Sequence, residues 1–139
     1  MKKKLLVAVV ASTLGLTACG GGSNNDSTQQ ISGIVADGYL LDATVCLDMN
    51  LNKSCDAGEP SAKSTAGGKY LLEGMSITDA ALYPVIAEIV QGVTTDADGN
   101  AITGDYILST PPGETNVNPI TTMIQTTMEG NPGLSIADA

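Results

Sequence analysis

The chain has 139 residues, of which 15 are acidic and six are lysine, with no arginine, no histidine and a net charge of −9 at pH 7. So few basic groups cannot neutralise a row of phosphates, which excludes nucleic acid as a partner. Without histidine, arginine or a G-x-S-x-G turn, the usual general bases, anion clamps and nucleophile are missing, and tryptophan and phenylalanine are absent as sugar-binding platforms. We therefore expect this chain not to be an enzyme.

The N-terminus has the organisation of an export signal. Three lysines at positions 2–4 precede an apolar run over residues 5–16, which is shorter than the roughly 20 residues that span a bilayer. We expect residues 1–18 to be a signal peptide. Its end, Leu16-Thr17-Ala18-Cys19, resembles the lipobox of bacterial lipoproteins, which implies that Cys19 becomes a lipidated N-terminus and anchors the chain in a membrane. The alternative is an ordinary secretory signal followed by an incidental cysteine.

The residues after the signal favour a location outside the cytoplasm. Gly20 follows the cysteine, and in such lipoproteins a residue other than aspartate there implies the outer membrane, at the cell surface or on the periplasmic face. Residues 19–30 are almost free of apolar side chains and are predicted to form a flexible tether. Removal of the signal leaves three lysines against all 15 acidic residues, a net charge near −12, which suits exposure outside the cell.

Residues 31–110 alternate between short apolar segments and turn signals. Segments rich in branched or aromatic residues cover 31–35, 43–47, 69–72, 83–90 and 101–108. Asp37-Gly38 and Asp98-Gly99-Asn100 are typical of the hairpins or loops between strands. This spacing predicts a mainly β fold, a small antiparallel β-sandwich over residues 31–110.

The segment from Asp48 to Glu59 has an oxygen-bearing side chain at nearly every second position. Calcium takes six to eight oxygen ligands, and a 12-residue loop supplies them from positions 1, 3, 5, 7, 9 and 12. We therefore predict a structural calcium site here. Its candidate ligands are Asp48, Asn50, Asn52, Ser54, Asp56 and Glu59. The alternative is an acidic turn that holds no ion.

Cys46 and Cys55 bracket most of this loop. Lipidation would consume Cys19, so the other two cysteines form a pair in an oxidising compartment, and a disulfide between them is expected. Binding of a soft metal by the two thiols is disfavoured, because the chain has no histidine and no further cysteine to complete a tetrahedral site. A disulfide would pre-order the loop and reduce the entropy lost in gathering its ligands.

The pattern changes in residues 111–139, which we expect to form a linker and a helical segment. Asn118 is a candidate N-cap with Pro119 at the first helical position, and the helix should end near Gly130. Apolar or partly apolar residues recur at helical spacing at Ile120, Met123, Ile124, Thr127 and Met128. Residues 135–138 have the pattern of a second helix start, so a further region is expected to begin here.

The segments 31–40, 43–48 and 65–70 resemble the carboxypeptidase-regulatory-like, prealbumin-like sandwich modules of bacterial surface proteins. This resemblance implies a seven-stranded sandwich of immunoglobulin type that serves as a stalk or interaction module and has no catalytic residues. The 48–59 loop is similar to the calcium loops in the B-type repeats of surface adhesins. It departs from an EF-hand, because Lys53 stands where the sharp turn uses glycine and the flanking segments are strand-like.

These features together predict an outer-membrane-anchored surface lipoprotein with a structural or adhesive β-sandwich. Its expected partners are the membrane, through the lipid anchor, and a protein or polysaccharide surface. Calcium and a disulfide would stabilise the sandwich. The alternative is an N-terminal accessory domain of a larger exported hydrolase or of a carbohydrate-binding or protein-binding protein.

Overall fold

The computed structural model describes residues 28–139, whose strands form two sheets. The predicted signal peptide, the lipidation of Cys19 and the tether up to residue 27 lie outside the described residues. No helix within the described residues is long and apolar enough to cross a membrane. The strands are β1 (Thr28–Val35), β2 (Thr44–Leu47), β3 (Ser61–Lys63), β4 (Lys69–Ser76), β5 (Val85–Ile89), β6 (Tyr106–Thr110) and β7 (Asn116–Val117). The helices are a short 3-10 turn, η1 (Ala66–Gly68), and two α-helices, α1 (Ile77–Leu82) and α2 (Pro119–Gly130).

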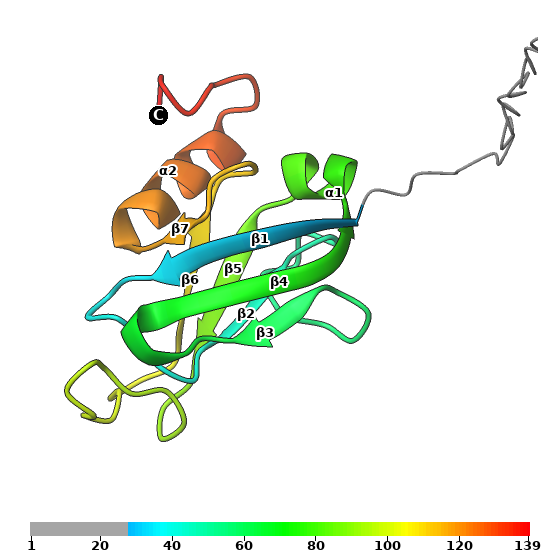
Figure 1. Ribbon diagram of the computed structural model, residues 1–139. Coiled ribbons are helices and arrows are strands. Elements are labelled where there is room, and N and C mark those ends of the chain that lie inside the picture. The colour runs from blue at the N-terminus through cyan, green and yellow to red at the C-terminus, as the bar shows by residue number, and fades with distance from the viewer. Residues whose placement is uncertain (1–27) are drawn as a thin grey trace, which may run out of the picture.

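The two sheets lie face to face, as the two layers in Figure 1 show. One sheet has the strand order β4-β1-β7 and the other has the order β3-β2-β5-β6. All strand pairs are antiparallel except β1 with β7, which run parallel and pair Ile34 with Asn116 and Val35 with Val117. The mainly β sandwich with a C-terminal helix is thus confirmed, although one of its pairings is parallel.

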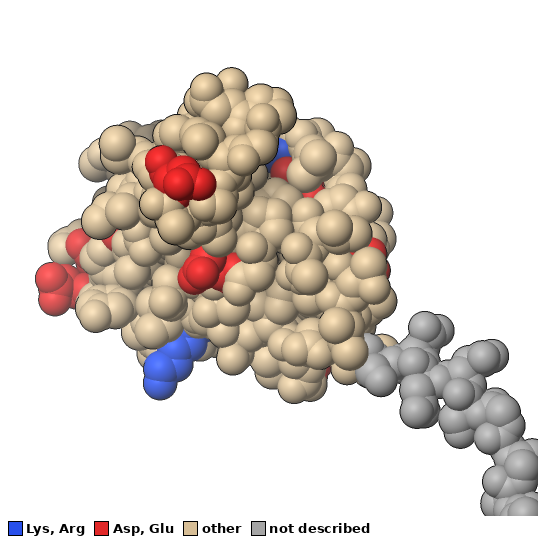
Figure 2. Space-filling view, turned by 90° about the horizontal axis from the view of Figure 1, so that it is seen from above, with Lys and Arg blue, Asp and Glu red and all other residues tan. Residues whose placement is uncertain are grey.

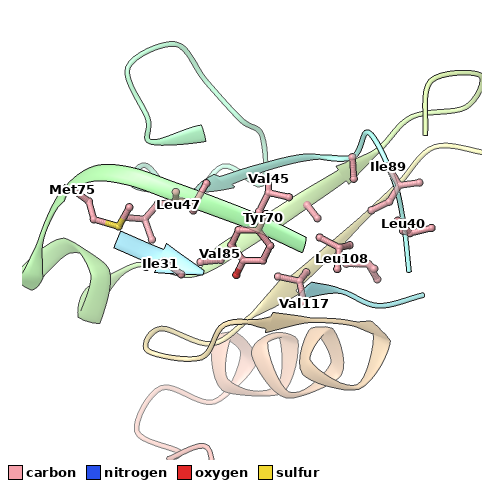
Figure 3. Close-up of a cluster of buried hydrophobic side chains, with 14 residues drawn as sticks. Ile31, Leu40, Val45, Leu47, Tyr70, Met75, Val85, Ile89, Leu108 and Val117 are labelled. Atoms are coloured by element: carbon pink, nitrogen blue, oxygen red, sulfur yellow. The ribbon is translucent and has the colours of Figure 1, made fainter. Parts of the chain in front are cut away.

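The core lies between the sheets and follows from the period-2 alternation of the strands. In β4, Tyr70 and Leu72 are buried between exposed neighbours, and Met75 is buried after a step of three residues, where the pairing with β1 shifts register. The strands β2 and β5 occupy the middle of their sheet and are buried almost throughout. Figure 3 shows these side chains converging from both sheets, with Tyr70 in the middle of the cluster.

A close contact joins β1 to the segment before β7. A Cβ atom at Gly33 would lie only 1.9 Å from the Thr115 carbonyl oxygen, so only glycine fits there. The hydroxyl of Tyr70 donates to the same carbonyl at 2.6 Å, and burial raises the pKa of this tyrosine. Gly33 therefore allows the chain after β6 to return against β1 and form the parallel pair.

Helix α2 begins as predicted but presents a different face to the sheet. Asn118 is its N-cap, Pro119 opens it, and a reciprocal capping box joins Asn118 to Thr121. The hydroxyls of Thr121 and Thr122 donate to the Ser109 carbonyl at 2.8 and 3.2 Å, which docks the helix on β6. The expected apolar stripe is not the buried face, because Ile120 and Met123 are both 71% exposed while Gln125 is buried.

The sandwich extends beyond the predicted range of 31–110 at both ends. β1 begins at Thr28, inside the segment expected to be a tether, and β7 lies within the expected linker. The strands β3 and β7 and the helix α1 were not predicted from the sequence. At the C-terminus, Ser135 and Asp138 bond to each other in a single turn, with 2.5 Å between the Ser135 hydroxyl and the Asp138 carboxylate.

Candidate metal-binding loop

The 48–59 loop connects β2 to β3 and is joined to β2 by a disulfide. Cys46 and Cys55 are bonded, as predicted, with their Cα atoms 5.6 Å apart. Cys46 is fully buried in β2, a central strand of its sheet. The half of the loop that contains Cys55 is therefore attached covalently to the most buried part of the sandwich.

Asp48 shapes the first half of the loop from a buried position. Its side chain is 1% exposed, and its two oxygens accept the backbone N–H groups of Asn52 (3.1 Å) and Lys53 (2.9 Å). Leu51 and Lys53 adopt left-handed backbone angles, with φ of 60° and 62°. Non-glycine residues adopt this conformation at a cost, which the bonds to Asp48 offset. Lys53 thus makes the sharp turn in the place of the glycine that EF-hands use.

Glu59 closes the loop from its other end. Its two carboxylate oxygens accept the backbone N–H groups of Met49 (2.8 Å) and Asp56 (3.0 Å). The first and last of the predicted ligands, Asp48 and Glu59, therefore both hold the backbone. Each of these oxygens has a second lone pair that the hydrogen bond leaves free.

The polar side chains between them bond to one another. The Oδ1 atoms of Asn50 and Asn52 accept the backbone N–H groups of Asn52 (3.0 Å) and Ser54 (2.8 Å). Their amide nitrogens both donate to Oδ2 of Asp56, at 2.8 and 2.6 Å. These two side-chain bonds lower the pKa of Asp56. All six predicted ligands are thus linked through one network of bonds, Ser54 through its backbone N–H alone.

Ser54 faces a different part of the molecule. Its hydroxyl donates to Oε1 of Glu88 on β5 at 3.0 Å, and the N–H of Cys55 donates to the same oxygen at 2.8 Å. Glu88 is half-buried and lies 33 residues from Cys55 in the sequence. The motif gave no sign of this residue, and the only signal was a carboxylate within the apolar strand β5.

The donor atoms of the loop are of the kind that a hard cation binds. All candidate ligands present oxygen, and Asp48, Asp56 and Glu59 supply three carboxylates. Within residues 28–139, no three Asp, Glu or Cys side chains form a group that could hold a metal ion. An ion would therefore need asparagine oxygens too, and the Asn50 and Asn52 amides now direct nitrogen toward Asp56. The Oδ1 atoms of both side chains accept backbone N–H groups, so turning these oxygens toward an ion would break those bonds.

Lys53 turns its side chain away from the loop. Its Nζ lies 2.8 Å from Oε2 of Glu129 on α2, and Oε1 of Glu129 accepts Nε2 of Gln125 at 2.8 Å. Partial burial raises the pKa of Glu129, but the bonds from Lys53 and Gln125 and the lysine charge outweigh it, so the pKa is lowered overall.

Figure 2 shows acidic side chains as separate patches among uncharged residues on the face it presents.

Comparison of the chain with protein-family models, curated proteins and solved structures finds no match. The resemblance to prealbumin-like surface modules and to adhesin calcium loops therefore stays a prediction that rests on the sequence.

Proposed function

We propose that this chain is an outer-membrane lipoprotein whose β-sandwich is a structural or adhesive module outside the cell. The lipid anchor at Cys19 and the tether would attach the module to the membrane. The module would contact a protein or polysaccharide surface. Calcium and the Cys46–Cys55 disulfide would stabilise its fold, which suits a compartment in which both are available.

One observation supports this proposal: a disulfide-bonded loop has oxygen-bearing side chains in calcium-loop order, and its one lysine is paired with Glu129 on α2. Asp48 and Glu59 hold the loop backbone, so a bound calcium ion would cross-link side chains that already lie in one network. With three carboxylates, an affinity of about 10⁻⁴ to 10⁻³ M is expected, as in other extracellular modules.

Thermal unfolding with and without calcium tests the ion site. At 5 mM calcium, this affinity would stabilise the folded state by about 1–2 kcal/mol. For a domain of this size, the melting temperature should then rise by about 5–15 °C. An unchanged melting temperature in calcium would overturn the calcium proposal.

Asp56→Asn is the best variant for this test. Asp56 is exposed and its carboxylate accepts only side-chain amides, whereas Asp48 and Glu59 also hold the backbone. The control is Asp98→Asn, because Asp98 is also an exposed loop carboxylate and lies outside the 48–59 loop. The calcium-dependent rise should disappear in Asp56→Asn and persist in the control.

The anchor is tested separately on the full-length chain in a bacterial host. Cys19→Ser should move the protein from the membrane fraction to the soluble extracytoplasmic fraction, because the acylated thiol is lost. A variant that remains in the membrane fraction would contradict lipid anchoring at this cysteine.

A further inference from the structure

Lys53 creates an electrostatic problem in the middle of the loop. Its backbone N–H is bonded to Asp48, so the lysine starts beside the carboxylates that would bind an ion. A lysine side chain has a flexible four-carbon stem and can place its ammonium on a nearby carboxylate. In that position it would neutralise the charge that attracts a divalent cation.

The structure holds this ammonium on another element. Glu129 on α2 pairs with it at 2.8 Å, although the two residues are 76 positions apart in the sequence. Gln125, one helical turn earlier, donates to the other oxygen of Glu129 and fixes the orientation of the carboxylate. Gln125 is itself buried against the sandwich, and α2 is docked on β6 through its threonines.

Stability alone does not account for this pair. The Lys53 and Glu129 side chains are 52% and 39% exposed, and such surface pairs contribute little to the free energy of unfolding. The pair does decide where the one positive charge of the loop lies. It is also the one ion pair between side chains in residues 28–139.

We propose that Glu129 is a positioning residue for the metal-binding loop, which keeps the Lys53 ammonium away from Asp48, Asp56 and Glu59 and so preserves the loop's affinity for a divalent cation. This inference rests on the calcium site of the proposed function. Helix α2 then completes the site without contributing a ligand, and calcium affinity depends on its docking.

Calcium titration of a double-mutant cycle tests the inference. In water, a unit charge about 6 Å from a divalent ion changes its affinity about tenfold, so Glu129→Gln should weaken calcium binding about tenfold. Glu129→Gln combined with Lys53→Gln should restore the wild-type affinity or exceed it, because no ammonium remains to enter the loop. Glu114→Gln is the control for net charge, since Glu114 lies between β6 and β7, outside both the 48–59 loop and α2.

A second measurement needs no calcium. In the wild-type protein, NMR contacts should join the Lys53 side-chain methylenes to Gln125 and Glu129. In Glu129→Gln, those contacts should be replaced by contacts to the loop side chains. This readout separates a failure of the lysine placement from a failure of the calcium site.

The outcomes are distinct. A wild-type protein that binds no calcium overturns both the proposed site and the inference. Calcium binding that is equal in wild type and Glu129→Gln overturns the inference alone. Weak binding in Glu129→Gln that Lys53→Gln does not restore also overturns it, because the loss would then come from a disturbed helix.

Discussion

Loss of the Cys46–Cys55 disulfide should lower the free energy of unfolding by an amount set by loop length. The bond closes a loop with a sequence separation of 9 residues. The chain-entropy relation for that length gives about 2.6 kcal/mol at 25 °C, because the open loop gains conformations in the unfolded state. For a domain of this size, the melting temperature should fall by about 10–20 °C.

Equilibrium denaturation in urea measures this effect in two ways. The first compares oxidised wild type with wild type in a reductant, which changes the cross-link and keeps both side chains. The second uses the Cys46→Ala, Cys55→Ala double variant, which also loses the packing of the buried Cys46 sulfur and should be the less stable of the two. Chelator in all buffers excludes a contribution from calcium.

Equal unfolding midpoints for reduced and oxidised wild type would refute this reasoning. It would mean that the bonds from Asp48, Glu59 and Glu88 already order the loop, or that the unfolded chain retains the loop closure. A loss far above about 4 kcal/mol would equally contradict it, since the entropy of so short a loop cannot supply that amount.

Two further predictions concern the sandwich. Gly33→Ala should destabilise the fold by about 2–3 kcal/mol, because the added Cβ would collide with the Thr115 carbonyl. Gly104→Ala is the control and should be nearly neutral, because its Cβ would meet no atom within 4 Å. Equal urea unfolding midpoints for the two variants would contradict the close contact at Gly33. Burial and the bond to Asp37 raise the pKa of Tyr106 to about 12, so its neutral form stabilises the fold below pH 10 and this contribution is lost as the pH rises through 12. The ionisation of Tyr106 can be followed by absorbance at alkaline pH, and Tyr106→Phe assigns its signal. The midpoint pH of this ionisation should be lower in Asp37→Asn than in wild type, and an unchanged midpoint would argue against the bond between Tyr106 and Asp37.

The strands that sequence reasoning located are those whose apolar residues face the core. β2, β4 and β5 have enough buried branched or aromatic side chains to produce a local signal. β3 and β7 produce no such signal, because they are only three and two residues long and exist through their pairing with β2 and β1. Such short strands depend on distant partners, so a local pattern does not reveal them.

Helix α2 shows that a sequence predicts the ends of a helix better than it predicts which face of the helix is buried. Its ends were predicted correctly, since the N-cap and the first-turn proline act within a few residues. Its buried face was not, because hydrogen bonds from Thr121 and Thr122 to Ser109 decide how the helix docks. Those bonds turn Ile120 and Met123 to solvent, although their spacing indicated an apolar face.

The 48–59 loop likewise has one feature that is local in the sequence and one that depends on distant elements. The order of its candidate ligands was visible in the sequence, but the attachment of three consecutive residues to three separate elements was not. Lys53 reaches α2 through Glu129, Ser54 reaches β5 through Glu88, and Cys55 is bonded to β2.

The side chains of Asn50, Asn52 and Asp56, in contrast, bond only within the loop. We infer a loop whose frame is held by Asp48, Glu59 and the disulfide, in which an arriving cation would exchange the bonds of the exposed Asn50 and Asn52 amides for its own. A frame fixed in advance would lower the ordering cost of the proposed calcium binding, which matters for an exposed site with only three carboxylates.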